Sequence, residues 1–426
     1  MDQKTTRRVL IASLVGSSIE WFDYFLYGTM AALVFNQLFF VSEDPTVGLI
    51  LAYASFALSF FIRPFGGVIF SHIGDRIGRK KTLVMTLSLM GAATFAMGLL
   101  PTYQAIGVAA PIILITLRLI QGLGIGGEWG GALLLATEYA PPERRGFFGS
   151  IPQMGVTIGM VMGTLALWIM TLLPEAAFMS WGWRVPFIFS ALLVVFGLWI
   201  RKGIDETPEF KAVQESGEIP KVPIVETLRY HWREVLITIG AKVVETAPFY
   251  IFSTFIVSYA TANLGFSRSA TLGAVMIATV VTTILIPIMG SLSDRVGRKK
   301  MYIVGTVSMM AYAFPYFWLI HQGSVALLII ATIIGLGIIW APITAVLGTM
   351  FSEIFEAKVR YTGVSLGYQI GAAVAGGTAP LVATALLATF ENSYVPVAIY
   401  IMFTAAVSLL AIWAVKGRMQ QPAYKA

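Results

Sequence analysis

Long runs of apolar residues, separated by proline, glycine and charged residues, follow one another along the whole chain. A helix needs about 20 predominantly apolar residues to cross a bilayer, and each run is roughly that long or longer. The pattern therefore predicts twelve membrane-spanning helices joined mostly by short polar connections. These helices are expected at residues 9–39, 46–71, 82–101, 108–139, 147–173, 184–201, 233–262, 268–292, 301–320, 325–352, 360–388 and 395–415.

The composition supports a membrane protein and excludes several classes of enzyme. Hydrophobic residues make up 57% of the 426-residue chain and charged residues only 12%, with a mean hydropathy of +0.79; soluble domains carry about twice that charged fraction. The absence of cysteine excludes disulfides, thiolate nucleophiles, iron–sulfur clusters and cysteine-ligated zinc. His72, His231 and His321 fall in expected loops, so no catalytic or metal-binding histidine is expected at bilayer depth. We therefore expect no enzyme activity, no metal and no cofactor.

Basic residues lie almost entirely in alternate connections, which predicts the orientation of the chain. If the N-terminus is inside, the outer connections contain only Arg184 and Arg268 among the lysines and arginines. The positive-inside rule then predicts that both termini are cytoplasmic. The first apolar run lacks a small-residue cleavage site, so it is expected to stay as a span. The formal net charge of +7 is accordingly a consequence of topology, and no nucleic-acid partner is expected.

A repeated segment indicates that the chain is built from two similar halves. Residues 72–81 (HIGDRIGRKK) recur as residues 291–300 (SLSDRVGRKK), in each case between the second and third expected helices of a half. Parallel repeats of this kind predict two six-helix bundles related by an axis along the membrane normal. We expect an N-terminal bundle over residues 1–201, a cytoplasmic linker over 202–232, and a C-terminal bundle with a short tail over 233–426.

The doubled Asp-Arg-x-Gly-Arg-Lys loop resembles the signature of the major facilitator superfamily, and the resemblance extends over essentially the whole chain. Shorter motifs are similar to those of the metabolite:proton symporters, and GEWGG at 127–131 with GYQ at 367–369 looks most like the shikimate-transporter branch. The resemblance implies the all-helical major facilitator fold and a secondary transporter of a small metabolite. The other motifs that carry it are EWFD at 20–23, RPFGG at 63–67, RLIQG at 118–122, GGE at 126–128 and WGWRVPF at 181–187.

Ionisable residues within the expected spans are candidates for function, because a charge at mid-bilayer costs about 2.5–3.5 kcal/mol. Glu20 and Asp23 are spaced to share one face of the first helix. We expect Asp23 to pair with Arg118 in one conformation and to be protonated in another, which links the proton to the conformational change. This arrangement is similar to that of proton-coupled sugar porters. Glu20 or Glu128 could carry the proton instead. A permanent structural ion pair is the alternative to any such switch.

Candidate substrate contacts lie at similar depths in both halves. The planar guanidinium of Arg118 suits a substrate carboxylate. Lys242 and Glu245 lie one turn apart on the seventh helix, where a ligand carboxylate could displace Glu245 from Lys242; alternatively, the two satisfy only each other. Hydroxyl, amide and aromatic side chains complete the expected site. These are Tyr24, Tyr27, Gln121, Gln153, Tyr250, Trp340 and Gln369.

Charged residues of the repeated loop and of nearby helix ends predict a cytoplasmic gate. We expect the loop residues to form ion pairs with Glu138 and Glu353 that break when this side opens; a solvated charge run serving only topology is the alternative. Arg63 is expected in the cytoplasmic half of the second helix, as a gate or inter-bundle ion partner rather than a ligand contact. The loop residues are Asp75, Arg76, Arg79, Asp294, Arg295 and Arg298.

Together these features predict a proton-coupled symporter of a bacterial inner or plasma membrane that imports a small organic acid by alternating access. The acid is expected to be shikimate-like or another mono- or dicarboxylate. The expected partners are this substrate, the proton and the lipid bilayer, and the protein is expected to act as a monomer. One alternative is a proton-coupled transporter of a zwitterion such as proline or betaine, which would need an aromatic box for the cation. Another is a membrane sensor with a transporter fold that does not transport.

Overall fold

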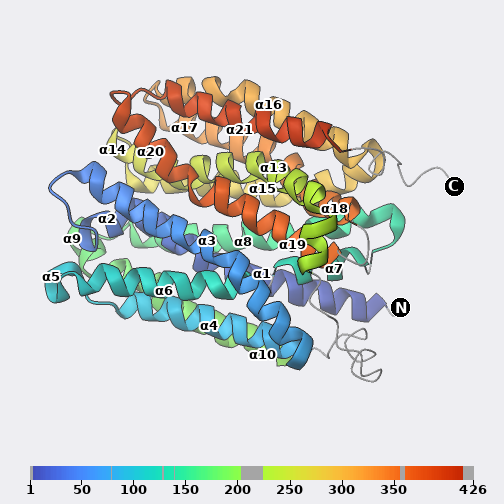
Figure 1. Cartoon of the computed structure of the whole chain (residues 1–426). Helices are drawn as coiled ribbons and strands as arrows, with labels where there is room; N and C mark the ends of the chain where they lie inside the picture. The colour runs from blue at the N-terminus through green and yellow to red at the C-terminus, as the bar shows by residue number, and fades with distance from the viewer. Residues whose placement is uncertain are drawn as a thin grey trace.

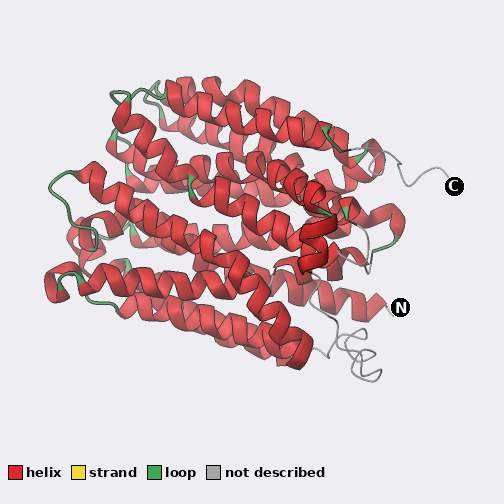
Figure 2. Ribbon diagram, in the orientation of Figure 1, coloured by secondary structure: helices red, strands yellow, loops and turns green. Residues whose placement is uncertain are grey.

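The computed structural model describes residues 3–77, 79–126, 129–138, 140–202, 224–355 and 360–415. Within these ranges the chain forms long helices lying side by side and no strand (Figures 1 and 2). Helices are the expected solution because a bilayer offers no hydrogen-bond partner to the backbone. The start of α1 (Gln3–Met30) and the end of α21 (Val395–Trp413) lie at one end of the molecule, named here the terminal end (Figure 1). The opposite end holds α5 (Tyr103–Ile106) and α14 (Ile256–Ala262).

The first half of the chain forms the bundle drawn in blue to green in Figure 1. Several of its long helices are joined by short helical segments at the opposite end. The elements are α1 (Gln3–Met30), η1 (Ala31–Phe35), α2 (Asn36–Leu38), α3 (Pro45–Ile77), α4 (Arg79–Leu99), α5, α6 (Ala109–Gly126), α7 (Trp129–Glu138), η2 (Pro142–Arg144), α8 (Arg145–Met170), α9 (Glu175–Ala177), η3 (Phe178–Gly182) and α10 (Arg184–Lys202).

The second half forms the bundle drawn in yellow-green to red. Three of its long helical stretches contain a π-helical segment between two α-helical parts. The elements are α12 (Ile224–Tyr230), α13 (Trp232–Tyr250), η4 (Ile251–Phe255), α14, α15 (Arg268–Val296), α16 (Arg298–Ile320), α17 (Val325–Thr332), η5 (Ile333–Ile339), α18 (Trp340–Ile354), α19 (Arg360–Gly371), η6 (Ala372–Gly377), α20 (Ala379–Thr389) and α21 (Val395–Trp413).

Length and composition identify nine helices among the described residues that could cross a membrane. A tenth results if Glu175–Gly182 and Arg184–Trp199, which meet at 43°, form one span. The apolar part of α4, Val84–Leu99, is shorter. An all-helical protein with many spans is therefore confirmed, whereas the count of twelve and the cytoplasmic position of both termini stay predictions.

The first long helix of each half changes geometry at a similar place. α1 continues into η1 and α13 into η4, both π-helical segments of five residues. In α13 the change follows Pro248, which cannot donate a backbone hydrogen bond. The two halves thus share this departure from regular helix, which is often found near functional sites.

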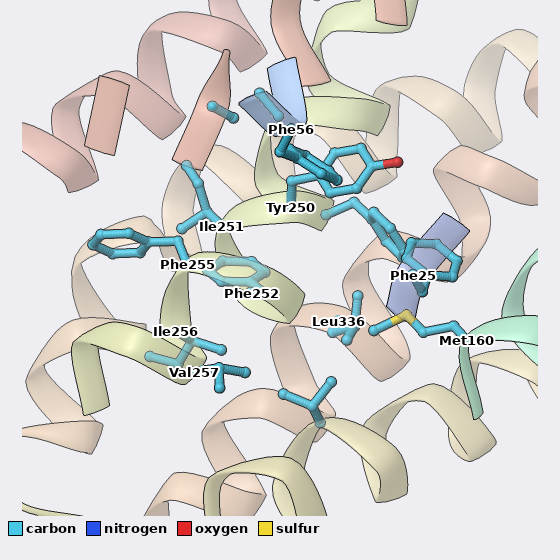
Figure 3. Packing of buried hydrophobic residues seen from close by; sticks show 14 of the residues in the cluster. Phe25, Phe56, Met160, Tyr250, Ile251, Phe252, Phe255, Ile256, Val257 and Leu336 are labelled. Carbon is cyan, nitrogen blue, oxygen red and sulfur yellow. The ribbon is translucent and has the colours of Figure 1, made fainter. Parts of the chain in front are cut away.

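The two halves meet along two seams. In one, α15 packs against α8; in the other, α3 packs against η6, α20 and α19. Aromatic side chains fill the interface, where the ring of Tyr250 lies 5.4 Å from that of Phe56 and 6.3 Å from that of Phe25 between ring centres (Figure 3). The buried core therefore continues from one half into the other.

Glycines let the fifth long helix of each half approach the first closely. A Cβ added to Gly159 of α8 would meet the backbone of Ser18 and Phe22 in α1. A Cβ added to Gly371 of α19 would likewise meet the side chain of Lys242 in α13. Small residues of this kind favour tight helix packing in membranes. The close approach brings side chains of α8 and α19 to the space between the halves.

Candidate functional site

A small cavity lies between the two halves and is lined by side chains from both. About 20 Å³ of it is accessible to the centre of a water molecule, enough for water but not for a metabolite without separation of the walls. Its walls are strongly aromatic and contain three charged groups. The lining residues are Trp21, Phe60, Arg63, Gln153 and Val156 from the first half, with Lys242, Glu245, Thr246, Phe249, Tyr250, Trp340, Tyr368 and Ala372 from the second.

Arg63 lines this cavity rather than the gate where the sequence analysis placed it. Its guanidinium carbon lies 4.1 Å from the ring centre of Tyr24 and 4.2 Å from that of Phe60, so aromatic faces hold the cation. The side chain is only 1% exposed, and its Nε and Nη2 atoms have no hydrogen-bond partner. A buried guanidinium that lines a cavity and has two nitrogens without partners is suited to an anionic ligand.

Arg118, the main candidate for the substrate carboxylate, lies inside the first half and is not among the residues that line the cavity. Its guanidinium carbon is 4.3 Å from the ring centres of both Tyr24 and Tyr27, and it donates a hydrogen bond to Gln121. Tyr24 is consequently in contact with the guanidinium groups of both Arg118 and Arg63. The predicted substrate roles of Arg118, Tyr27 and Gln121 stay predictions, and their placement separates them from the cavity.

Asp23 is fully buried in the same polar region of the first half. Ser190 of α10 donates a hydrogen bond to one carboxylate oxygen, and the other oxygen has no hydrogen-bond partner. Within the described part of the chain, no ion pair joins Asp23 to Arg118. Gln121 links the two helices instead, donating to the Asp23 backbone carbonyl over 3.3 Å. The structure therefore represents a conformation without the expected pair.

Three other predicted residues lie around these clusters. Glu20 is buried on α1, one turn before Asp23. Gln369 is buried on α19 without lining the cavity. Glu128 lies outside the residues that the structure describes. The proton-carrying roles proposed for Asp23, Glu20 and Glu128 are untested by these placements.

Lys242 and Glu245 form a buried ion pair at the cavity wall. Glu245 also accepts hydrogen bonds from Thr246 at 2.9 Å and from Thr344 at 3.0 Å. The Lys242 ammonium lies 3.6 Å from the ring centre of Tyr368. The pair is therefore part of a wider polar network, which also includes a bond from the Trp340 indole to the Glu245 carbonyl at 2.5 Å.

Several residues of this site carried no signal in the sequence. Ser190 and Thr344 are ordinary polar residues of apolar helices, which contain many serines and threonines. Phe60 and Phe249 are indistinguishable by sequence from the other phenylalanines of the core. Only their positions beside charged groups single them out, and these depend on how the helices are packed.

Charged residues at the terminal end join the two halves beyond the cavity. The Asp294 carboxylate accepts hydrogen bonds from the backbone amides of Gly146, at 2.8 Å, and Phe147, at 3.1 Å, in the first turn of α8. This position suits an anion because the first amides of a helix lack partners and carry partial positive charge. Arg298 pairs with Asp294 at 3.0 Å and with Glu353 at 2.9 Å.

The other predicted gate residues are an exposed arginine and four residues whose side chains the structure does not describe. Arg295 is exposed on the terminal end. The side chains of Asp75, Arg76, Arg79 and Glu138 lie outside those that the structure describes. The structure thus brings together Asp294, Arg298 and Glu353 from the predicted gate, and their role in opening stays a prediction.

Contacts between the halves also lie on the opposite side of the cavity. The Tyr53 hydroxyl is 2.9 Å from that of Ser258, and Arg268 donates to both carboxylate oxygens of Glu175 at 2.6 Å. With Asp294 at the terminal end, the halves are held together on both sides of the cavity.

Comparison with known proteins places this architecture in one family. The family model described as Major Facilitator Superfamily matches residues 13–376 and again residues 249–424. The chain belongs to the major facilitator superfamily. A similar relative is the shikimate transporter of Escherichia coli (strain K12), 39% identical, with 95% of this chain and 93% of the relative covered.

Other relatives differ in what their names say they carry. The glycine betaine/proline/ectoine/pipecolic acid transporter OusA of Dickeya dadantii (strain 3937) is 35% identical, with coverage of 99% of this chain and 85% of the relative. Among solved structures, a D-xylose-proton symporter superposes with a TM-score of 0.74, covering 98% of this chain and 99% of that one. At 18% identity, this likeness shows the fold alone.

Membership in the major facilitator superfamily confirms three predictions from the sequence. The resemblance to this superfamily and the all-helical fold are confirmed. The chain is a multi-pass membrane transporter rather than an enzyme, since relatives that match over nearly its whole length are transporters.

Proposed function

We propose that this major facilitator superfamily protein imports a small organic acid together with a proton across a bacterial inner membrane. The observation that carries the proposal is the buried Arg63 guanidinium, whose Nε and Nη2 atoms lack partners at a cavity that Lys242 lines from the other half. Two buried guanidinium nitrogens without hydrogen-bond partners are unfavourable, and a carboxylate in the cavity would relieve this by pairing with them. One relative is named an inner membrane metabolite transport protein, which accords with the proposed location.

The charges at the cavity favour an anion over a zwitterion. A betaine-type ligand would need free aromatic faces for its cationic group. The faces nearest the cavity charges are already in use: Arg63 lies over Phe60, and Lys242 over Tyr368. A second external cation would also be repelled by both residues. We therefore place the organic acid before proline or betaine, although relatives of both kinds exist.

For the proton we propose Asp23, with Glu20 and Glu128 as the alternatives. Asp23 is fully buried, and one of its carboxylate oxygens accepts a hydrogen bond from Ser190. Arg118 of α6 has donors without partners. Formation of the Asp23–Arg118 pair in another conformation would favour the ionised carboxylate, and its loss would favour the protonated one. Substrate and proton would then occupy separate places in one alternating-access cycle.

The test is transport by the purified protein in proteoliposomes that contain an interior pH dye. Shikimate, a smaller monocarboxylate, a dicarboxylate and betaine are offered in turn to the wild type and to Asp23→Asn. We expect acidification with a carboxylate in the wild type only. Equal acidification by Asp23→Asn would move the proton to Glu20 or Glu128. Entry of labelled carboxylate without acidification would refute proton coupling, and binding without entry would favour a sensor.

A further inference from the structure

A chain of hydrogen bonds crosses between the two halves directly beside the cavity. The Trp129 indole of α7 donates to the side-chain carbonyl oxygen of Gln153 in α8 at 3.2 Å. The Gln153 amide donates to the Thr344 hydroxyl of α18 at 3.0 Å, and this hydroxyl donates to the Glu245 carboxylate of α13 at 3.0 Å. We name these four residues the interface chain. All four are buried.

The interface chain has one possible direction. An indole N–H can only donate, so the Gln153 oxygen must face Trp129 and its amide nitrogen must face Thr344. The Thr344 oxygen therefore accepts, and its hydrogen is left for Glu245. The chain must end on an acceptor, and Glu245 meets this requirement as an ionised carboxylate.

Lys242 pairs with Glu245 and closes the network into a ring. Its ammonium is paired with Glu245, and Thr246 adds a third donor to the same carboxylate. Lys242 also lies over the Tyr368 ring, which stacks on Trp129 with 3.4 Å between ring centres. Two links of the ring join the halves, namely Gln153 to Thr344 and Trp129 to Tyr368.

We propose that the interface chain is a lock between the halves that an organic anion releases, with Gln153 and Thr344 as its positioning residues. The inference rests on the proposed function for the identity of the ligand, but not for the lock itself. A carboxylate that approaches Lys242 competes with Glu245 for the ammonium. Two carboxylates at one cation repel each other, so Glu245 turns away and Thr344 loses its acceptor.

The surrounding charges make the lock selective for anions. The charged or titratable side chains near Glu245 are Lys242 on its own helix, Arg63 on α3, Tyr368 on α19 and Tyr302 on α16. A neutral ligand competes for neither cation and leaves the Lys242–Glu245 pair intact. A cationic ligand would be repelled by Arg63 and Lys242 before it reached Glu245.

The lock can be tested without any ligand. Because the chain has no cysteine of its own, a single introduced cysteine can be labelled specifically. Ser293 is buried where α15 meets α8, so Ser293→Cys reports separation of the halves at the terminal end through its rate of maleimide labelling. In this background we expect Thr344→Val to label about tenfold faster, equivalent to about 1.4 kcal/mol. Thr344→Ser retains the hydroxyl and should label at the background rate.

A matched control and a second variant separate the lock from general destabilisation. Thr384 is a buried threonine of the same half whose hydroxyl bonds within its own helix, to the Pro380 carbonyl at 2.8 Å, so Thr384→Val should label at the background rate. Glu245→Gln should label as fast as Thr344→Val, since Thr344 and Lys242 donate to different oxygens of Glu245 and an amide retains only one of the two as an acceptor. Unchanged labelling of Thr344→Val and Glu245→Gln, or equal acceleration in Thr384→Val, would overturn the proposal.

Shikimate serves as the probe for release by an anion. It should accelerate labelling of the background protein and add little in Thr344→Val, while its affinity for that variant, measured by titration calorimetry, rises by up to about tenfold because binding no longer has to break the lock. Equal acceleration by shikimate in both proteins would show that the interface chain does not respond to the anion. If shikimate neither binds nor accelerates labelling, the proposed substrate is wrong, and the ligand-free rates alone decide the lock.

Discussion

At the scale of single residues, the most informative feature is the arrangement of two buried arginines around one tyrosine. Tyr24 lies within 4.3 Å of both guanidinium carbons, that of Arg63 at the cavity and that of Arg118 inside the first half. An aromatic face stabilises both guanidinium groups, each of which has Nε and Nη2 atoms without a hydrogen-bond partner. We therefore expect Arg63 to be available to an anionic ligand.

Arg63→Gln should weaken binding of the transported carboxylate by roughly 10- to 150-fold. This corresponds to the loss of hydrogen bonds to a charged group, about 1.5–3 kcal/mol. The measurement is the half-saturation concentration for uptake in proteoliposomes. Arg229→Gln, which changes an exposed arginine of α12, is the control and should transport normally. An unchanged half-saturation concentration in Arg63→Gln would indicate that the substrate carboxylate binds Arg118 instead.

Tyr24→Leu should destabilise the protein by about 2 kcal/mol or more, because it removes the ring that contacts two desolvated cations. Tyr24→Phe keeps the ring and should be much closer to the wild type. Thermal unfolding of both variants in detergent makes the comparison. Equal melting temperatures would mean that the ring contributes packing volume only.

At the scale of helices, glycines decide how closely elements approach. Gly159 of α8 lies against the backbone of α1, and backbone cannot move aside as a side chain can. Gly273 of α15 differs, because an added Cβ would meet only the Trp168 indole at an ordinary distance of 3.7 Å. The two glycines therefore predict opposite outcomes for the same substitution.

Gly159→Ala should destabilise the protein by about 1–3 kcal/mol through overpacking. Gly273→Ala should be neutral or slightly stabilising, since alanine favours helix more than glycine does. Apparent melting temperatures in one detergent compare the pair directly. A melting temperature for Gly159→Ala at or above that of Gly273→Ala would contradict the close packing of α8 on α1.

At the scale of the whole molecule, contacts between the halves lie on both sides of the cavity. Asp294 binds the first turn of α8 at the terminal end, and Glu175 pairs with Arg268 at the opposite end. The cavity between them is too small for a metabolite. We therefore expect these contacts to break in turn during transport, as the halves move relative to each other.

Asp294→Asn should favour opening at the terminal end, because it removes the charge from two hydrogen bonds and from the pair with Arg298. We expect severalfold faster maleimide labelling of Ser150→Cys, a buried position of α8. The control is Arg295→Gln, which alters the adjacent exposed charge. Similar labelling rates for Asp294→Asn and its control would mean that both residues serve only the membrane topology of the chain.

Hydrophobic runs, the doubled loop and the one-sided basic residues were enough to establish a multi-span helical transporter of this superfamily. These properties are local: each span is apolar over its own length, and each motif can be recognised from its own residues. The Lys242–Glu245 pair was also predictable, since the two lie one turn apart on one helix.

Which side chains face the cavity was decided only by the tertiary structure. Distance along a helix predicts depth, but the direction in which a side chain points depends on the packing of neighbouring helices. For this reason Arg63, expected at a gate, lines the cavity, whereas Arg118, expected at the substrate, lies against Tyr24 and does not line it. The bonds from Gln153 to Thr344 and from Trp129 to Gln153 likewise join residues of different helices, so no pattern along a single helix could have predicted them.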